Sequence, residues 1–281
     1  MAILVREYGL LFIMVPGTGC SVVGGQLRRE LGGEWLPTEA ERGKRKIDRK
    51  HNTIPQLLEH GFLRPEDLDR YVVFATVRNP FDHLVTYYQR LAGTWSSDVL
   101  IPFMKKDLER GREELTESEY EDRVRGIEAR KARLSRRARL IGRVGFERWL
   151  MATSLRRRLS SLRTAKDSRR SGVTEHLFPM IEGVHVVMRQ ERLEEGLNEI
   201  LRVAGVGREL TIEKRNVTPG KRPYSEYYSR TTRLMFEALF KDELREFGYG
   251  FEGPTDDRPL IWVDPRAKER LRAVGPPSIR A

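Results

Sequence analysis

An apolar run leads straight into a glycine loop near the start of the chain, in the residues Leu10-Leu11-Phe12-Ile13-Met14-Val15-Pro16-Gly17-Thr18-Gly19-Cys20-Ser21. Its six apolar residues, 10–15, predict a buried strand, and Pro16-Gly17 predicts that the strand ends in a tight loop. Beyond the loop, apolar residues recur at helical spacing until Gly32-Gly33 ends the pattern, at Val23, Leu27 and Leu31. The sequence therefore predicts a strand, a glycine loop and a helix in succession.

Two further strand-to-helix units follow along the chain. Tyr71–Val77 is dense in β-branched and aromatic residues and predicts a second buried strand. It runs into Arg78-Asn79-Pro80, where Asn79 can cap a helix whose first position is Pro80. Val184–Met188 predicts a third strand, which a helix follows after Arg189. Three such units favour an α/β fold in which helices flank a parallel sheet.

The residues between the second and third units are charged and rich in arginine. Residues 104–172 show helical periodicity only in patches, so they predict a helical insertion. We expect a single domain over residues 1–252 that carries this basic insertion, followed by a C-terminal tail over residues 253–281.

The composition fits a soluble protein of the cytoplasm. With 281 residues, 39% of them hydrophobic, the chain can bury a substantial core. No apolar run approaches the roughly 18 to 20 residues of a membrane span. The single cysteine, Cys20, excludes an internal disulfide and a site with several cysteine ligands. The histidines have no metal-ligand spacing, so no metal is expected.

The formal net charge of +11 is concentrated in one segment. Residues 128–170 hold 15 Lys and Arg against 3 Asp and Glu, a local charge of +12, so the rest of the chain sums to −1. Such a segment can attract an anionic polymer or a membrane surface. A solvated helical face rich in arginine explains it equally well.

The loop at residues 16–21 is suited to bind a phosphate. Unpaired N–H groups and the helix dipole both point into a loop before a helix, and two glycines allow a close approach. The loop lacks the Gly-Lys-Ser/Thr ending of a Walker loop. Taken alone, it is equally consistent with a glycine turn that has no function.

The residues around the loop resemble the sulfotransferases that use 3′-phosphoadenosine 5′-phosphosulfate (PAPS). Residues 12–21 are similar to the family's 5′-phosphosulfate loop, usually an apolar strand followed by Pro-Lys-Thr-Gly and two Ser or Thr. Arg78-Asn79-Pro80, with Thr86 eight residues after the arginine, resembles the family's 3′-phosphate element. Lys50-His51-Asn52-Thr53 resembles the Lys-His-any-Thr of the carbohydrate-type members.

Weaker similarities follow in the family's order. Phe146-Glu147, the segment 189–193 and the segment 216–224 resemble its later elements, and Phe247-Gly248-Tyr249 resembles its ending. The resemblance spans residues 10–251 apart from the insertion.

The resemblance implies transfer of a sulfuryl group from PAPS to a hydroxyl or amine, with 3′-phosphoadenosine 5′-phosphate (PAP) as product. The acceptor would be a carbohydrate or glycoconjugate, and no metal would take part. His51 would be the general base, with Lys50 beside it, although a polar residue at a helix start is the ordinary alternative. The residues implied to bind PAPS are Pro16, Gly17, Thr18, Gly19, Cys20, Ser21, Arg78, Thr86, Lys221 and Arg222.

Gly17 departs from the family pattern, because it stands where the family usually has lysine. That lysine would stabilise the charge that develops on the leaving phosphate oxygen. Either Lys50 or Lys221 takes its place, or turnover is weak or lost.

Two other classes of protein stay open from the sequence. A small-molecule kinase would also use a strand, a loop and a helix to hold phosphate, although the Walker lysine is missing. A non-catalytic protein that binds PAP or an anionic polymer would explain both Gly17 and the basic segment.

Overall fold

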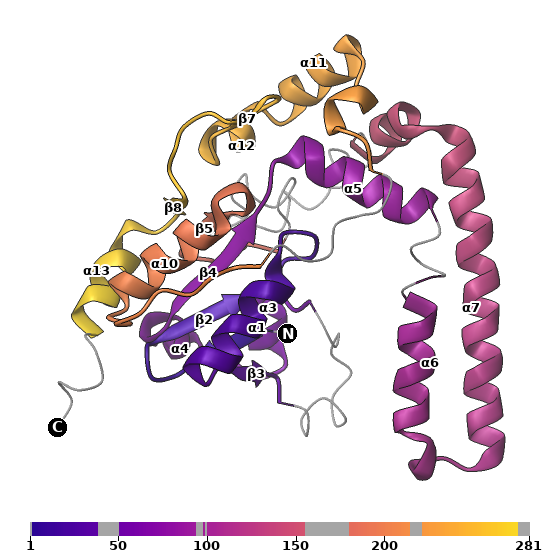
Figure 1. Cartoon of the computed structure of the whole chain (residues 1–281), viewed down its shortest axis with the longest axis horizontal. Helices are drawn as coiled ribbons and strands as arrows, with labels where there is room; N and C mark the ends of the chain where they lie inside the picture. Colours follow the sequence, from indigo (N-terminus) through magenta and orange to yellow (C-terminus); the bar gives the residue numbers. More distant parts are fainter. Residues whose placement is uncertain are drawn as a thin grey trace. The chain divides into compact units, whose positions relative to one another are not determined.

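The computed structural model describes residues 2–38, 51–93, 98, 100–154, 180–213 and 221–274 (Figure 1). The chain divides into two compact units. The first comprises residues 1–80, 160–217 and 237–281, and the second comprises residues 81–159 and 218–236. The helical hairpin of the expected insertion lies in the second unit, and residues 155–172 of that expected insertion lie outside the described residues.

A six-stranded mixed sheet with the order β3-β1-β2-β4-β5-β8 forms the core of the first unit. Its three central strands are parallel: β2 (Leu10–Ile13), β4 (Val72–Val77) and β5 (Val186–Arg189). The remaining strands pair antiparallel at the two edges: β1 (Ala2–Val5), β3 (Glu34–Leu36) and β8 (Leu260–Trp262). The prediction of a parallel sheet is therefore confirmed for the centre and wrong for the edges.

Short connections explain the antiparallel edge at β1. Only the turn at residues 6–9 separates β1 from β2, and a turn of this length can join antiparallel neighbours but not parallel ones. At the other edge, β8 comes from the segment that the sequence presented as a tail. It pairs with β5 in the register Val187 to Ile261.

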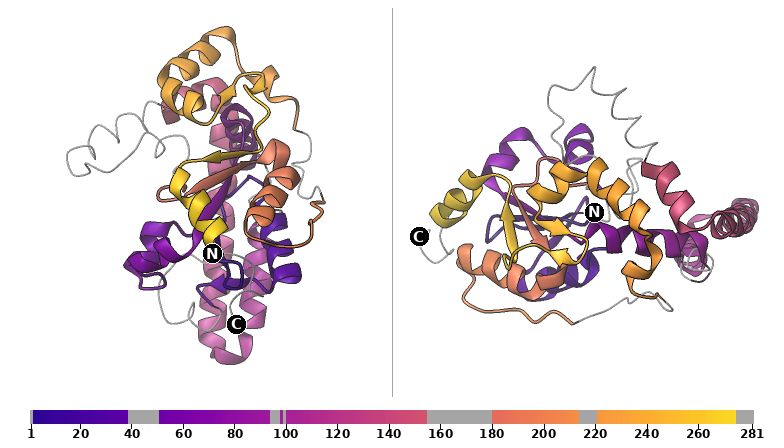
Figure 2. Two further views of the ribbon diagram at one scale, coloured as in Figure 1. Left: turned by 90° about the vertical axis from the view of Figure 1, so that its left-hand side faces the viewer. Right: turned by 90° about the horizontal axis from the view of Figure 1, so that it is seen from above.

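Two helices cover one face of the sheet, α1 (Cys20–Leu31) and α10 (Leu193–Val203) (Figure 2). Helix α1 begins seven residues after the end of β2, and α10 begins four residues after the end of β5, as expected for strand-to-helix units. Their buried apolar residues form one core cluster with alternate residues of the strands, among them Leu27, Leu197, Phe12, Phe74 and Met188.

Shorter elements complete the first unit. The helices are α3 (Ile54–Glu59), α4 (Pro65–Arg70), α12 (Lys241–Glu246), α13 (Pro265–Val274) and the 3₁₀ turn η3 (Gln190–Arg192). A small hairpin joins β6 (Tyr249–Gly250) to β7 (Gly253–Pro254). Thr53 caps α3 by accepting a hydrogen bond from the Gln56 N–H, in a capping box with the Gln56 side chain.

The second unit is helical. Its elements are α5 (Pro80–Ala92, whose first residue belongs to the first unit), α6 (Ile101–Arg110), η2 (Arg112–Glu114), α7 (Glu117–Val144), η4 (Tyr224–Tyr227) and α11 (Arg230–Leu239, which ends in the first unit). Residues 146–154 are also helical. Helices α6 and α7 lie side by side as a hairpin (Figure 1), around a small core of Ile101, Leu108 and Ile127.

Glu147 fastens the start of α11 within this second unit. Its carboxylate accepts hydrogen bonds from the Ser229 N–H at 2.7 Å and from the Thr232 hydroxyl at 2.6 Å. These hydrogen bonds, those from Ser229 first, lower the pKa of the Glu147 carboxyl. Glu147 therefore acts as a structural residue at a helix start.

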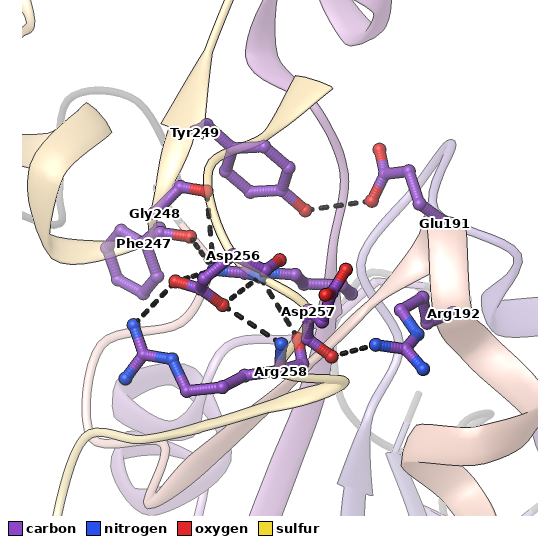
Figure 3. Close-up of polar contacts among 9 residues, drawn as sticks. Glu191, Arg192, Phe247, Gly248, Tyr249, Asp256, Asp257 and Arg258 are labelled. Atoms are coloured by element: carbon purple, nitrogen blue, oxygen red, sulfur yellow. Dashed lines mark hydrogen bonds and ion pairs between the residues drawn. The ribbon is translucent and has the colours of Figure 1, made fainter.

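A fully buried arginine at the end of β5 anchors the C-terminal segment. The Arg189 Nη1 donates to Asp256 Oδ1 at 2.7 Å and to the carbonyl oxygen of Arg258 at 3.0 Å, and its Nη2 donates to the carbonyl oxygen of Phe247 at 3.0 Å. The three residues that accept these bonds are labelled in Figure 3. A buried charge is tolerated only where acceptors surround it. Arg189 therefore holds residues 247–258 against the sheet.

The carboxylate of Asp256 is stabilised by this arrangement. Hydrogen bonds from Arg258, and then from Arg189, hold its pKa far below the usual range for aspartate. A carboxyl whose folded-state pKa is lowered stabilises the folded protein at every pH above its unfolded-state pKa, about 3.9. That contribution is lost as the pH falls toward the folded-state pKa.

We expect Asp256→Asn to lower the free energy of unfolding by roughly 2 kcal/mol at pH 7, since charged hydrogen bonds to a buried guanidinium are lost. The difference from the wild type should shrink as the pH falls below about 4. Urea unfolding between pH 7 and pH 3 measures both. Asp257→Asn is the matched control, because the Asp257 backbone carbonyl, and not its carboxylate, accepts the bond from Arg192. A difference that stays constant with pH would contradict the assignment.

Candidate functional site

The loop between β2 and α1 is built on two glycines in the left-handed conformation. Gly17 has a φ of 83° and Gly19 a φ of 81°, and Gly19 is the N-cap residue of α1. Residues other than glycine rarely adopt this left-handed backbone conformation. A Cβ on Gly19 would also lie 2.9 Å from Cδ2 of Leu193. The loop therefore depends on glycine at both places.

The Thr18 hydroxyl is used inside the protein. Thr18 is buried, and its Oγ1 donates to the carbonyl oxygen of Val15 at 2.8 Å. It also bonds to Oγ1 of Thr76 in the neighbouring strand β4. Because a hydroxyl has one proton, Thr18 donates to Val15 and accepts from Thr76. The side chain fastens the loop to β4, which leaves the backbone N–H of Thr18 as its candidate donor to a ligand.

The rest of the loop presents backbone groups and one exposed hydroxyl. Cys20 is buried, whereas Ser21 is exposed. The N–H groups of Val22 and Val23 both donate to the Gly19 carbonyl, and those that precede them have no acceptor within the helix. No acidic residue occupies the first turn of α1. This end of α1 is suited to an anion.

Arg78 brings a positive charge to the loop. It follows β4 directly, and its Nη1 donates to the carbonyl oxygen of Gly17 at 3.1 Å. Strands β2 and β4 are parallel neighbours, so the loop and Arg78 both lie at the carboxyl edge of the sheet. Ligands of open α/β sheets bind at this edge.

Glu191 supports the corner that carries Arg78. Its Oε1 accepts a hydrogen bond from the Asn79 N–H at 2.7 Å. Its Oε2 accepts one from the Tyr249 hydroxyl at 2.9 Å (Figure 3). Burial, and then the nearby charge of Glu191, raises the pKa of Tyr249, so the phenol stays protonated and donates. The residue next to Arg78 is thus tied to the C-terminal segment.

His51 is half-buried and oriented by the end of β2. Its Nδ1 lies 2.8 Å from the carbonyl oxygen of Met14. A carbonyl only accepts, so the hydrogen bond requires the proton on Nδ1. In the neutral ring the basic nitrogen is then Nε2. This tautomer is the one that a general base at Nε2 requires.

The other predicted residues lie elsewhere in the chain. Thr86, Lys221 and Arg222 belong to the second unit. The Thr86 hydroxyl donates to the carbonyl oxygen of Asp82 at 3.0 Å, and Lys221 forms an ion pair with the Asp82 carboxylate. Arg222 is exposed and lies 3.3 Å from Glu226. Lys50 lies outside the described residues, as does the segment 214–220.

Sequence reasoning missed Asn52, which follows His51. Its side chain is completely buried, and neither its amide nitrogen nor its amide oxygen has a hydrogen-bond partner in the described part of the chain. An unpaired buried amide destabilises a protein and calls for an explanation. Its role could not be predicted from the motif, because Asn52 fills the variable position of the Lys-His-any-Thr pattern.

In the first unit, the structure gathers the loop, Arg78 and His51 at the end of β2 and β4. The arrangement offers backbone donors, a guanidinium and an oriented imidazole, which suits binding of an anion and removal of a proton beside it. Among the described residues, no group of three His, Cys, Asp or Glu side chains could hold a metal ion. Within the same residues, no helix combines the length and apolarity that crossing a bilayer requires.

One comparison with known proteins gave a match. A family model described as "Sulfotransferase family" matches residues 1–250 of the chain. No curated protein and no solved structure matches significantly.

We expect Gly19→Ala to lower the free energy of unfolding by roughly 2 kcal/mol, because alanine is strained in the left-handed conformation. The same change should weaken the binding of inorganic pyrophosphate, measured by calorimetry. Gly25→Ala is the control: it lies on the same helix, and its Cβ would meet only Nη1 of Arg29 at an ordinary 3.6 Å. It should be neutral or slightly stabilising. Equal effects of the two changes would contradict the role given to Gly19.

Proposed function

The chain belongs to the sulfotransferase family, and we propose that it transfers a sulfuryl group from PAPS to a hydroxyl or amine of an acceptor molecule. The contact between Arg78 and Gly17 carries the proposal most directly. It brings a guanidinium to the loop position at which the family's usual lysine is missing. A charge at this place can stabilise the leaving phosphate of the donor.

The conformation of Gly17 supports a charge supplied from elsewhere. A lysine at this φ of 83° would cost about 1 to 2 kcal/mol in backbone strain. A guanidinium also matches the geometry of phosphate oxygens better than an ammonium does, because it offers paired N–H groups. Arg78 is therefore our first candidate for the missing cation, ahead of Lys221, which pairs with Asp82.

In the proposed reaction, the backbone donors of residues 17–21 hold the 5′-phosphosulfate at the start of α1. Nε2 of His51 takes the proton of the acceptor while the acceptor oxygen, or nitrogen, forms a bond to sulfur. The bond between sulfur and the bridging phosphate oxygen breaks, and PAP leaves with the electron pair. The protein contributes position and charge, as in phosphoryl transfer.

The 3′-phosphate contacts and the acceptor rest on the family resemblance. Thr86, Lys221 and Arg222 are proposed for the 3′-phosphate. For Thr86 this requires its hydroxyl to turn from the Asp82 carbonyl, to which it now donates. The resemblance assigns Arg78 to the same phosphate, which is the alternative to its role beside Gly17. A carbohydrate or glycoconjugate acceptor is proposed from the similarity of Lys50 and His51 to the carbohydrate-type pattern.

Binding of PAP tests the donor assignment. The wild type should bind PAP more tightly than ATP, which lacks the 3′-phosphate. Arg78→Ala should weaken PAP binding by roughly 1.5 to 3 kcal/mol, because a charged contact to a phosphate is lost. Calorimetry measures both, and Arg202→Ala, an exposed arginine at the end of α10, is the control.

A comparison of PAP with AMP locates the contact. If only PAP binding weakens in Arg78→Ala, the arginine contacts the 3′-phosphate; if both weaken, it acts at the 5′-phosphate in the loop. Equal affinity of the wild type for PAP and ATP would reject the donor and favour a kinase. Tight PAP binding without turnover on a panel of sugar, phenol and amine acceptors would favour a non-catalytic binding protein.

Two substitutions at His51 separate catalysis from support. His51→Ala should lower kcat by about 10² to 10⁴-fold and leave PAP affinity intact, since a general base contributes a factor of this size. His51→Asn can still donate a hydrogen bond to the Met14 carbonyl but has no basic nitrogen, and we expect the same loss. Release of PAP from PAPS measures the rate. If asparagine restored turnover, His51 would be a support for β2 and not the base.

A further inference from the structure

Helix α7 carries a concentrated positive charge over its second half. Residues 129–144 contain seven basic residues and no acidic residue: Arg130, Lys131, Arg133, Arg136, Arg137, Arg139 and Arg143. All seven side chains are exposed. None of them forms an ion pair with a residue that the structure describes. The ion pairs of α7 lie in its first half, such as Arg125 with Asp122 and Glu128 with Lys105.

Three of these arginines, Arg133, Arg136 and Arg137, lie outside the side of α7 that packs against α6. Val124, Ile127 and Leu134 belong to the core between the two helices. At 3.6 residues per turn, Arg133 and Arg136 lie about 130° and 170° around the helix from the mean direction of these core positions, and Arg137 lies about 90° from it. One face of α7 is therefore fixed by packing, and the opposite face is basic and has no partner within the described residues.

Two large apolar side chains lie within this basic face. Leu140 is 64% exposed and Val144 is 40% exposed. They follow Arg133 and Arg136 at spacings of four to eleven residues, which places them on the same side of the helix. We call the face formed by Arg133, Arg136, Arg137, Leu140 and Val144 the basic-apolar face.

The combination of charge and apolar side chains selects the partner. A soluble polyanion neutralises arginines but gives Leu140 and Val144 no apolar surface to contact. Single-stranded nucleic acid is held by aromatic side chains that stack on bases, and residues 129–144 contain no aromatic residue. An anionic membrane surface offers lipid phosphates to the arginines and acyl chains to the two apolar residues.

We propose that the basic-apolar face of α7 docks the protein on a membrane surface that contains anionic lipid. The helix lies on the surface, with Leu140 and Val144 at the boundary of headgroups and acyl chains. The arginines contact lipid phosphates. This attachment is separate from the proposed transfer reaction, because none of these residues belongs to the loop, to Arg78 or to His51.

Co-sedimentation with lipid vesicles tests the proposal on the full chain. Vesicles of phosphatidylcholine with about 30% phosphatidylglycerol should retain the protein, and vesicles of phosphatidylcholine alone should not. The triple variant Arg133→Glu, Arg136→Glu, Arg137→Glu should bind at least about tenfold more weakly. The double variant Leu140→Ser, Val144→Ser keeps every charge and should bind about fivefold more weakly.

The matched control is Lys241→Glu, Arg245→Glu, Arg266→Glu, which changes the net charge equally at exposed positions of α12 and α13. It should retain wild-type vesicle binding. Thermal unfolding checks that each variant is folded. If the control loses binding as the α7 triple does, net charge alone explains the attachment. If the protein binds heparin or duplex DNA but no vesicle, the face serves a soluble polyanion and the proposal fails.

Discussion

The buried guanidinium of Arg189 ties the end of β5 to the C-terminal segment of the first unit. A charge without contact to water must be surrounded by acceptors, and here they come from the Asp256 carboxylate and from carbonyl groups after residue 246. The chain must therefore return to the end of β5 to supply them. Two residues further on, Glu191 ties Asn79 to Tyr249. One end of the sheet thus fixes both the C-terminal segment and the corner that presents Arg78.

Local sequence patterns predicted the central part of this fold well. The strand before the loop, the helix that ends at Gly32 and the strand before Arg78 each carry their signal within a few residues. The edge strands carry no such local signal. Residues 2–5 and 260–262 are short apolar runs whose partners are chosen by a tight turn in one case and by distant residues in the other. The hydrophobic pattern of a short strand alone predicts neither the direction of the strand nor the neighbouring strand with which it pairs.

The site shows the same division. The loop, Arg78 and His51 were proposed from the sequence because each stands in a short motif that resembles one of the family's. The hydrogen bond between the Thr18 and Thr76 hydroxyls was not predicted, because the two residues are 58 positions apart in the sequence. The contacts of Glu191 and the unpaired amide of Asn52 also depend on packing between distant segments. A motif identifies residue types, whereas the partners of each side chain come from the tertiary structure.

The position of Asp256 and β8 also bears on where this protein could be shortened. The family match ends at residue 250, but the acceptors for Arg189 at Asp256 and Arg258, and the edge strand beside β5, come later in the chain. A truncation at the end of the match would expose one side of β5 and leave a buried cation with fewer acceptors. The cooperative folding unit is therefore longer than the segment that homology marks out, and residues 251–262 are integral to it.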